Sequence, residues 1–221
     1  MKTKLLRVLA LTLALLSLSL AFSACSSNPA KDLGDIVYVE IDMENGDYIK
    51  LELYPRIAPI TVANFVKLCN EHFYDGIIFH RVIPNFMVQG GDPMGTGMGG
   101  SKEEIKGEFS ANGVKNDISH VRGVISMARL GENPYTGEKN YDSASSQFFI
   151  MHQDNTSLDG QYAAFGRVIE GMETVDAIAN VATDPNDKPL VDQKIDTIRV
   201  ITEAEAKTAG KAPVTEATVE E

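Results

Sequence analysis

The feature that most constrains the fold is a β-hairpin signal early in the chain. Apolar residues alternate with polar ones on both sides of Asn45-Gly46, which is the spacing of half-buried strands. Asn and Gly are favoured in a type I′ turn because both of its central residues need a positive φ. The alternating residues are Val37, Val39, Ile41 and Met43 before the turn and Ile49, Leu51 and Leu53 after it. The pattern predicts two antiparallel strands.

The remaining apolar residues predict many strands and only two helices. A helix is expected after Pro59, because Val62, Phe65, Val66 and Cys69 recur at helical spacing. A second, short helix is expected from Met172 to Ala179. Short apolar runs, each read as a strand, lie at 77–83, 87–89, 123–128, 148–151, 163–169 and 195–201. This composition of elements favours an antiparallel barrel or sandwich in a single domain.

The first 24 residues predict a secretory signal peptide. Three basic residues within the first seven positions precede an apolar stretch from Val8 to Leu20, and the small residues Ser23 and Ala24 follow. An uncleaved membrane anchor is the alternative, because the apolar run is nearly long enough to span a bilayer. The small residues and the cysteine after them favour cleavage.

The segment Phe22-Ser23-Ala24-Cys25 resembles the bacterial lipoprotein signal, in which the cysteine becomes the lipidated first residue of the mature chain. The resemblance implies a protein anchored through Cys25 on the extracytoplasmic face of the cell membrane. A disulfide between Cys25 and Cys69 is less favoured, because Cys69 lies on the apolar face of the first expected helix. The expected organisation is a tether over 25–35, a folded domain over 36–202 and an acidic flexible tail over 203–221.

The net charge of the chain limits the classes of partner that it is expected to bind. With 20 basic and 31 acidic residues the net charge is −11, and removal of residues 1–24, which hold three basic and no acidic residues, leaves 17 against 31, or −14. Such a surface repels nucleic acid and anionic lipid. A nucleic-acid partner is therefore not expected, and attachment to a membrane would depend on the lipid chains themselves.

The most unusual segment is 79–92, which reads F-H-R-V-I-P-N-F-M-V-Q-G-G-D. It places Arg81 and Gln89 among strongly apolar residues, which costs free energy unless the polar groups are paired or used. For an arginine on its own, a structural role with the stem packed and the head in water would be the simpler interpretation.

This segment resembles a signature of the cyclophilin family, and 145–150, S-S-Q-F-F-I, resembles the second signature of that family. Residues 123–128 and 158–166 also match, in the same order, so the resemblance covers most of 36–201. It implies a mainly β fold, an eight-stranded antiparallel closed β-barrel with two helices. It also implies a monomeric peptidyl-prolyl cis/trans isomerase that needs no metal or cofactor. The implied substrates are proline-containing or unfolded polypeptides, here exported proteins that are folding.

The resemblance also implies the roles of individual residues. Arg81 is the implied catalytic residue, which donates a hydrogen bond to the prolyl nitrogen of the twisted transition state. The apolar members of the substrate site would form a proline pocket, and its two glutamines would position substrate carbonyl groups or Arg81. The implied substrate-binding residues are Phe86, Met87, Gln89, Ala128, Arg129, Gln147, Phe149, Leu158 and Tyr162.

Three positions depart from the pattern of many eukaryotic members. Ser157 stands where they carry Trp, Tyr162 where they carry His, and Arg129 where they carry Asn. Because Ser157 replaces Trp, strong binding of cyclosporin is not expected. A rival function is a lipid-anchored chaperone or proline-binding module that does not need turnover, with the polar loop 130–142 as a partner-binding insertion.

Two other signals carry less weight. Residues 95–100 contain G-x-G-x-x-G, but no long helix can follow before Gly107, so a loop beside the pocket is expected rather than a dinucleotide site. A hydrolase triad built on His80 or His120 lacks the G-x-S-x-G elbow that exposes a nucleophile.

Overall fold

The computed structural model describes residues 33–208. The expected signal peptide, Cys25 and most of the tether lie outside the described residues, as does the tail beyond residue 208. The strands are β1 (Val37–Met43), β2 (Tyr48–Leu53), β3 (Arg81–Ile83), β4 (Met87–Gly90), β5 (Val124–Met127), β6 (Phe148–Met151), β7 (Ala164–Glu170) and β8 (Ile195–Ile201). They form one antiparallel sheet in the order β3-β4-β6-β5-β7-β2-β1-β8.

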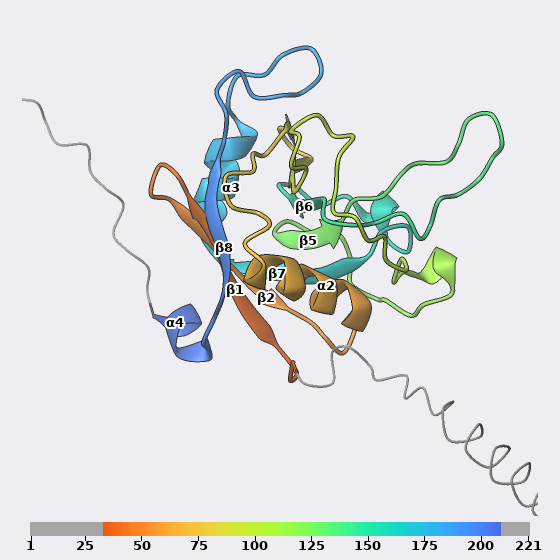
Figure 1. Ribbon diagram of the computed structural model, residues 1–221, viewed down its shortest axis with the longest axis horizontal. Helices are drawn as coiled ribbons and strands as arrows, with labels where there is room; N and C mark the ends of the chain where they lie inside the picture. Colours follow the sequence, from red (N-terminus) through yellow and green to blue (C-terminus); the bar gives the residue numbers. More distant parts are fainter. Residues whose placement is uncertain (1–32, 209–221) are drawn as a thin grey trace, which may run out of the picture.

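The sheet curls into a half-barrel (Figure 1). Its edge strands, β3 and β8, do not pair with each other. The segment before β3 does meet the start of β8, because Phe79 N donates to Gln193 O and Ile195 N donates to Ile77 O, both at 2.9 Å. The eight antiparallel strands expected from the sequence are confirmed. Within residues 33–208 they form a curled sheet, and the strand pairing between β3 and β8 that would close a barrel is not seen.

The predicted hairpin is confirmed, but its turn is of a different type. Strands β1 and β2 pair in register, with Val39 opposite Leu51. Gly46 has a φ of 91°, while Asn45 does not adopt a positive φ. Met43 N donates to Asp47 O and Gly46 N donates to Met43 O, so the loop holds three residues with glycine in the last position. The type I′ prediction was wrong because the Asn45 side chain instead accepts a hydrogen bond from Asp47 N, at 3.1 Å.

Both predicted helices are confirmed, as α2 (Pro59–Asn70) and α3 (Met172–Ala179). The apolar face of α2 is buried, and the Phe65 ring lies 5.2–5.5 Å from the rings of Tyr74, Phe148 and Phe165. Cys69, on the same face, is a free and buried thiol. In Figure 1, α2 lies across the lower part of the sheet and α3 lies at the upper left.

A third helix, α4 (Glu203–Lys207), follows β8 and was not among the two expected. Thr202 and Glu205 form a capping box at its start, and Ala206 is buried. Lys50, only 3% exposed, donates a hydrogen bond to Thr208 O at 2.6 Å. The beginning of the predicted acidic tail is therefore folded against the domain.

Within 33–208, the structure has no helix of the length and hydropathy that crossing a membrane requires.

The approach of α3 to the hairpin generates a stability prediction. Gly171 has a φ of 88°, and a Cβ added there would lie 2.3 Å from Tyr48 O. We expect Gly171→Ala to lower the free energy of unfolding by about 3 kcal/mol, as measured by denaturant unfolding. Gly113→Ala is the matched control, because the φ of Gly113 is a similar 75° and a Cβ added there would meet no atom beyond its chain neighbours within 4 Å. This control should lose about 1 kcal/mol, and equal losses in the two variants would contradict the steric argument.

Candidate active site

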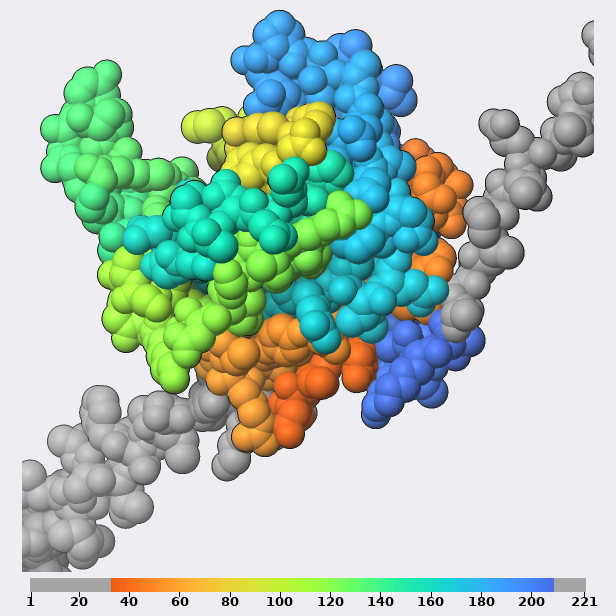
Figure 2. All heavy atoms as spheres, turned by 180° about the vertical axis from the view of Figure 1, so that it is seen from behind, coloured from red at the N-terminus to blue at the C-terminus, as the bar shows by residue number. Residues whose placement is uncertain are grey.

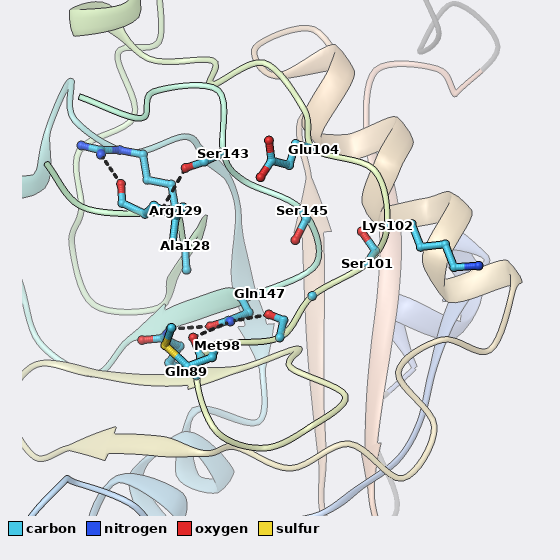
Figure 3. A pocket seen from close by; sticks show the side chains of 14 residues that line it. Gln89, Met98, Ser101, Lys102, Glu104, Ala128, Arg129, Ser143, Ser145 and Gln147 are labelled. Atoms are coloured by element: carbon cyan, nitrogen blue, oxygen red, sulfur yellow. Dashed lines mark hydrogen bonds between the residues drawn. The ribbon is translucent and has the colours of Figure 1, made fainter. Parts of the chain in front are cut away.

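A cavity of about 200 Å³ opens on the outer face of the sheet. Nine of the ten residues expected from the sequence to act on substrate line it, and the tenth, Gln147, lines an adjoining pocket of about 440 Å³ (Figure 3). Gln89, Ala128 and Arg129 line both pockets. The lining of the smaller cavity is Arg81, Phe86, Met87, Gln89, Ala128, Arg129, Phe149, Leu158 and Tyr162.

The pairing of the strands explains why these residues meet. Arg81 on β3 lies opposite Gln89 on β4, and Gln89 lies opposite Phe149 on β6. Residues paired across antiparallel strands project from the same face of the sheet. The strand register therefore places a cation, an amide and an aromatic ring in one row along the cavity.

The floor of the cavity is apolar. Met87 and Phe149 are almost fully buried and belong to a small cluster separate from the main core. The Tyr162 ring meets the Phe149 ring edge-on, with centroids 5.7 Å apart. Phe86 and Leu158 pack against the same cluster. The cavity can thus receive a small apolar ring beside the half-exposed guanidinium of Arg81.

The two glutamines are fixed by a chain of hydrogen bonds. Gln89 Nε2 donates to Gln147 Oε1 at 2.8 Å, and Gln147 Nε2 donates to Gly97 O and Gly99 O at 3.0 and 2.7 Å. In Figure 3 these side chains lie together on one side of the larger pocket, with Ala128 and Arg129 on the other. The amide of Gln89 is therefore held by the glycine-rich loop through Gln147.

Asp92 organises that loop. Its carboxylate is buried and accepts hydrogen bonds from the backbone N–H groups of Met94, Thr96 and Gly97 at 2.6–2.9 Å. Burial by itself would raise the pKa of Asp92, but the backbone hydrogen bonds outweigh it and hold the pKa below its ordinary value of 3.8. A Cβ at Gly99 would lie 2.1 Å from Asp92 Oδ1. The glycines thus allow the loop to wind around a carboxylate, in agreement with the loop expected from the sequence.

The side chain of Arg129 has a structural role that the sequence did not reveal. Its guanidinium carbon lies 4.8 Å from the ring centroid of Tyr162 and 5.2 Å from that of Tyr141. It also donates hydrogen bonds to Gln161 O and Leu130 O, at 3.0 and 2.8 Å. Arg129 therefore joins the rim of the cavity to the base of the loop 130–142, which projects from the body in Figure 2 and carries a 96%-exposed Tyr135.

A serine, a histidine and an aspartate meet beneath the cavity. His120 Nδ1 lies 2.9 Å from Asp159 Oδ1, and His120 Nε2 lies 3.1 Å from Ser126 Oγ. Both Ser126 and His120 are fully buried, so no substrate can reach the serine hydroxyl. The His120 ring stacks on the Phe149 ring at 6.1 Å. The geometry indicates support for the cavity floor and not hydrolysis, in line with the absence of a nucleophile elbow.

Comparison with known proteins gives consistent matches. The family model described as "Cyclophilin type peptidyl-prolyl cis-trans isomerase/CLD" matches residues 38–200. Peptidyl-prolyl cis-trans isomerase B of Bacillus subtilis is 46% identical over 62% of this chain and 87% of its own length. Peptidyl-prolyl cis-trans isomerase ppi1 of Schizosaccharomyces pombe is 42% identical over 66% and 88%. A crystal structure of a Cryptosporidium parvum cyclophilin type peptidyl-prolyl cis-trans isomerase, in the presence of the dipeptide Ala-Pro, superposes with a TM-score of 0.65 at 31% identity, over 75% of this chain and 99% of that one.

The Asp92 carboxylate generates a prediction about pH. The folded-state pKa is depressed, so the stabilisation is fully present above the unfolded-state pKa and is lost as the pH falls through the folded-state value. We expect Asp92→Asn to lower the free energy of unfolding by about 2 kcal/mol at pH 7, and this difference from wild type to shrink below about pH 4. Denaturant unfolding at several pH values measures it. Asp117→Asn, at an exposed aspartate, is the control, and a difference for Asp92→Asn that is constant with pH would refute the argument.

Proposed function

Since this chain belongs to the cyclophilin family and is a peptidyl-prolyl cis-trans isomerase, we propose that it isomerises Xaa-Pro bonds in the cavity of about 200 Å³, with Arg81 as the catalytic residue. The observation that carries this proposal is the row of Arg81, Gln89 and Phe149 across three paired strands. The row sets the Arg81 guanidinium beside the apolar floor of the cavity.

The reaction needs no proton transfer and no covalent intermediate. Amide resonance opposes rotation about the Xaa-Pro bond with a barrier of about 20 kcal/mol. As the bond twists, the prolyl nitrogen loses resonance and becomes more basic. A guanidinium beside that nitrogen donates a hydrogen bond that is stronger in the transition state than in the ground state, which is the condition for raising the rate.

The other residues of the site would orient the peptide. Met87, Phe149 and Leu158 provide apolar surface for the proline ring, which removes that surface from water. Gln89, held in place by Gln147, presents its amide beside Arg81. The N–H of Ala128 already donates to Gln147 O at 2.9 Å, so the residue before proline would pair with other main-chain groups of the 128–129 segment.

We also propose that the enzyme acts outside the cytoplasm, anchored by lipid at Cys25, on exported proteins that fold slowly at proline. The support is the sequence of residues 1–25, with its basic start, apolar stretch and small residues before the cysteine. The acidic composition supports attachment through lipid chains, because a chain with a net charge of −14 after cleavage, 17 basic against 31 acidic residues, is repelled by anionic headgroups.

Replacement of Arg81 tests the mechanism. Arg81→Ala should lower kcat/KM on a short Xaa-Pro peptide at least about 100-fold, a loss of about 2.7 kcal/mol of transition-state stabilisation. NMR exchange spectroscopy measures the rate without a coupling protease. Arg56→Ala, which removes a surface arginine paired with Asp35, should retain wild-type activity. Wild-type activity of Arg81→Ala would refute the mechanism, and full suppression of client aggregation by the inactive variant would support the rival chaperone function.

The anchor is tested on the exported chain. After expression with its own N-terminus in bacteria, mass spectrometry should find a mature chain that begins at an acylated Cys25, and the protein should sediment with membranes. Cys25→Ser should be released from membranes without the acyl mass. Cys69→Ala, the matched control at a buried thiol, should remain acylated. A mature chain with a free thiol at position 25, or one that begins elsewhere, would exclude the lipoprotein assignment.

A further inference from the structure

A turn between α3 and β8 contacts Arg81 from outside the cavity. Asp187 Oδ2 lies 3.5 Å from Arg81 Nε, and both side chains are a little over two-fifths exposed. The backbone of the same residue is attached to β3, because Val82 N donates to Asp187 O at 2.8 Å. Arg81 lines the cavity, whereas Asp187 is not part of its lining. The backbone of Asp187 is therefore fixed beside Val82, and its carboxylate lies beside Arg81.

The turn is built to hold Asp187 in that position. Asp184 Oδ1 accepts hydrogen bonds from Asn186 N and Lys188 N at 2.8 and 3.0 Å. Asp184 N in turn donates to Lys188 O, and Asp187 N donates to Asp184 O. Lys188 Nζ reaches Gly95 O at 3.2 Å, which joins the turn to the glycine-rich loop. Three sets of contacts thus determine where the Asp187 backbone lies.

Asp187 has a backbone conformation that few residues other than glycine adopt. Its φ of 64° lies in the left-handed region, where glycine is free of strain and other residues are uncommon. A glycine would relieve the backbone but would leave no carboxylate beside Arg81. Aspartate is among the residues that adopt this conformation most readily, and within the described residues the ion-pair partner of its carboxylate is Arg81.

We propose that Asp187 is a positioning residue for the isomerase reaction. The inference rests on the proposed catalytic role of Arg81. An exposed arginine samples many rotamers, and a half-exposed ion pair adds little to stability. The contribution of the carboxylate is orientation: it holds the Nε edge of the guanidinium from the solvent side. Gln89 faces Arg81 across the strand pair, and the terminal nitrogens are left to meet the prolyl nitrogen.

The effect of this contact is expected in turnover rather than in binding. Most of the apolar contact with the proline ring would come from Met87, Phe149 and Leu158, in a cavity that Asp187 does not line. Orientation of the donor matters most when the amide is twisted, because only then does the prolyl nitrogen accept strongly. Loss of the carboxylate should therefore lower kcat and leave KM nearly unchanged.

Asp187→Asn is the test variant, because asparagine tolerates the left-handed conformation and removes only the charge. We expect kcat on an Xaa-Pro peptide to fall about fivefold to tenfold, with KM changed less than about twofold. The Nε–H resonance of Arg81 in an NMR spectrum should shift. Asp192→Asn is the matched control on the same segment, exposed and without a hydrogen bond or ion pair to Arg81 in the described structure. It should retain wild-type kcat and an unshifted Arg81 resonance.

A double variant separates this inference from the proposed mechanism. Asp187→Asn should have no further effect on the residual activity of Arg81→Ala. If Arg81→Ala keeps full activity, the mechanism fails and Asp187 has nothing to position. If Arg81→Ala is inactive but Asp187→Asn matches Asp192→Asn in kcat and in the Arg81 resonance, the inference alone is wrong. A loss of kcat that persists undiminished in the Arg81→Ala background would also overturn it.

Discussion

Strand β6 buries all four of its side chains, two on each face of the sheet. Phe148 and Ile150 belong to the main core, and Phe149 and Met151 belong to the cluster beneath the cavity. Because side chains alternate along a strand, Phe149 in the cavity floor is bonded to Phe148 and Ile150, which are locked in close packing on the other face. The position of the floor is therefore set by the core, and the rest of the site is built onto it.

The groups that act at the rim come from loops and not from strands alone. Asp92 shapes the glycine-rich loop, which holds Gln147 and through it Gln89. Asp187 approaches Arg81 from a separate turn, and Arg129 connects the rim to the projecting loop. Asp92 and Arg129 each satisfy several partners at once, whereas the Asp187 side chain pairs with Arg81. The polar half of the site is therefore held by hydrogen bonds and ion pairs, while the apolar half is held by packing.

The sequence predicted most of this fold because local patterns are strong where one face of an element is buried. The β1–β2 hairpin and α2 show clear periods for that reason. In β5 and β6 every side chain is buried, so the residues form nearly continuous apolar runs. Only the family resemblance distinguished their cavity face from their core face. The contacts that the sequence missed, of Asp187 with Arg81 and of His120 with Asp159, join residues far apart in the chain. No local pattern encodes such pairs. The short helix α4 lies at the start of the expected tail, where its capping box is visible in the sequence as Thr202 and Glu205.

The burial of Cys69 bears on how the protein responds to oxidants. Thiols react as thiolates, and burial raises the pKa of Cys69 far above neutral pH. In the folded chain this sulfur is therefore protonated and also shielded by the packing of α2 against the sheet. Glutathione, peroxide or a thiol-labelling reagent gains access to it only when α2 opens. The rate at which Cys69 is modified is thus a measure of how often this folding catalyst itself unfolds.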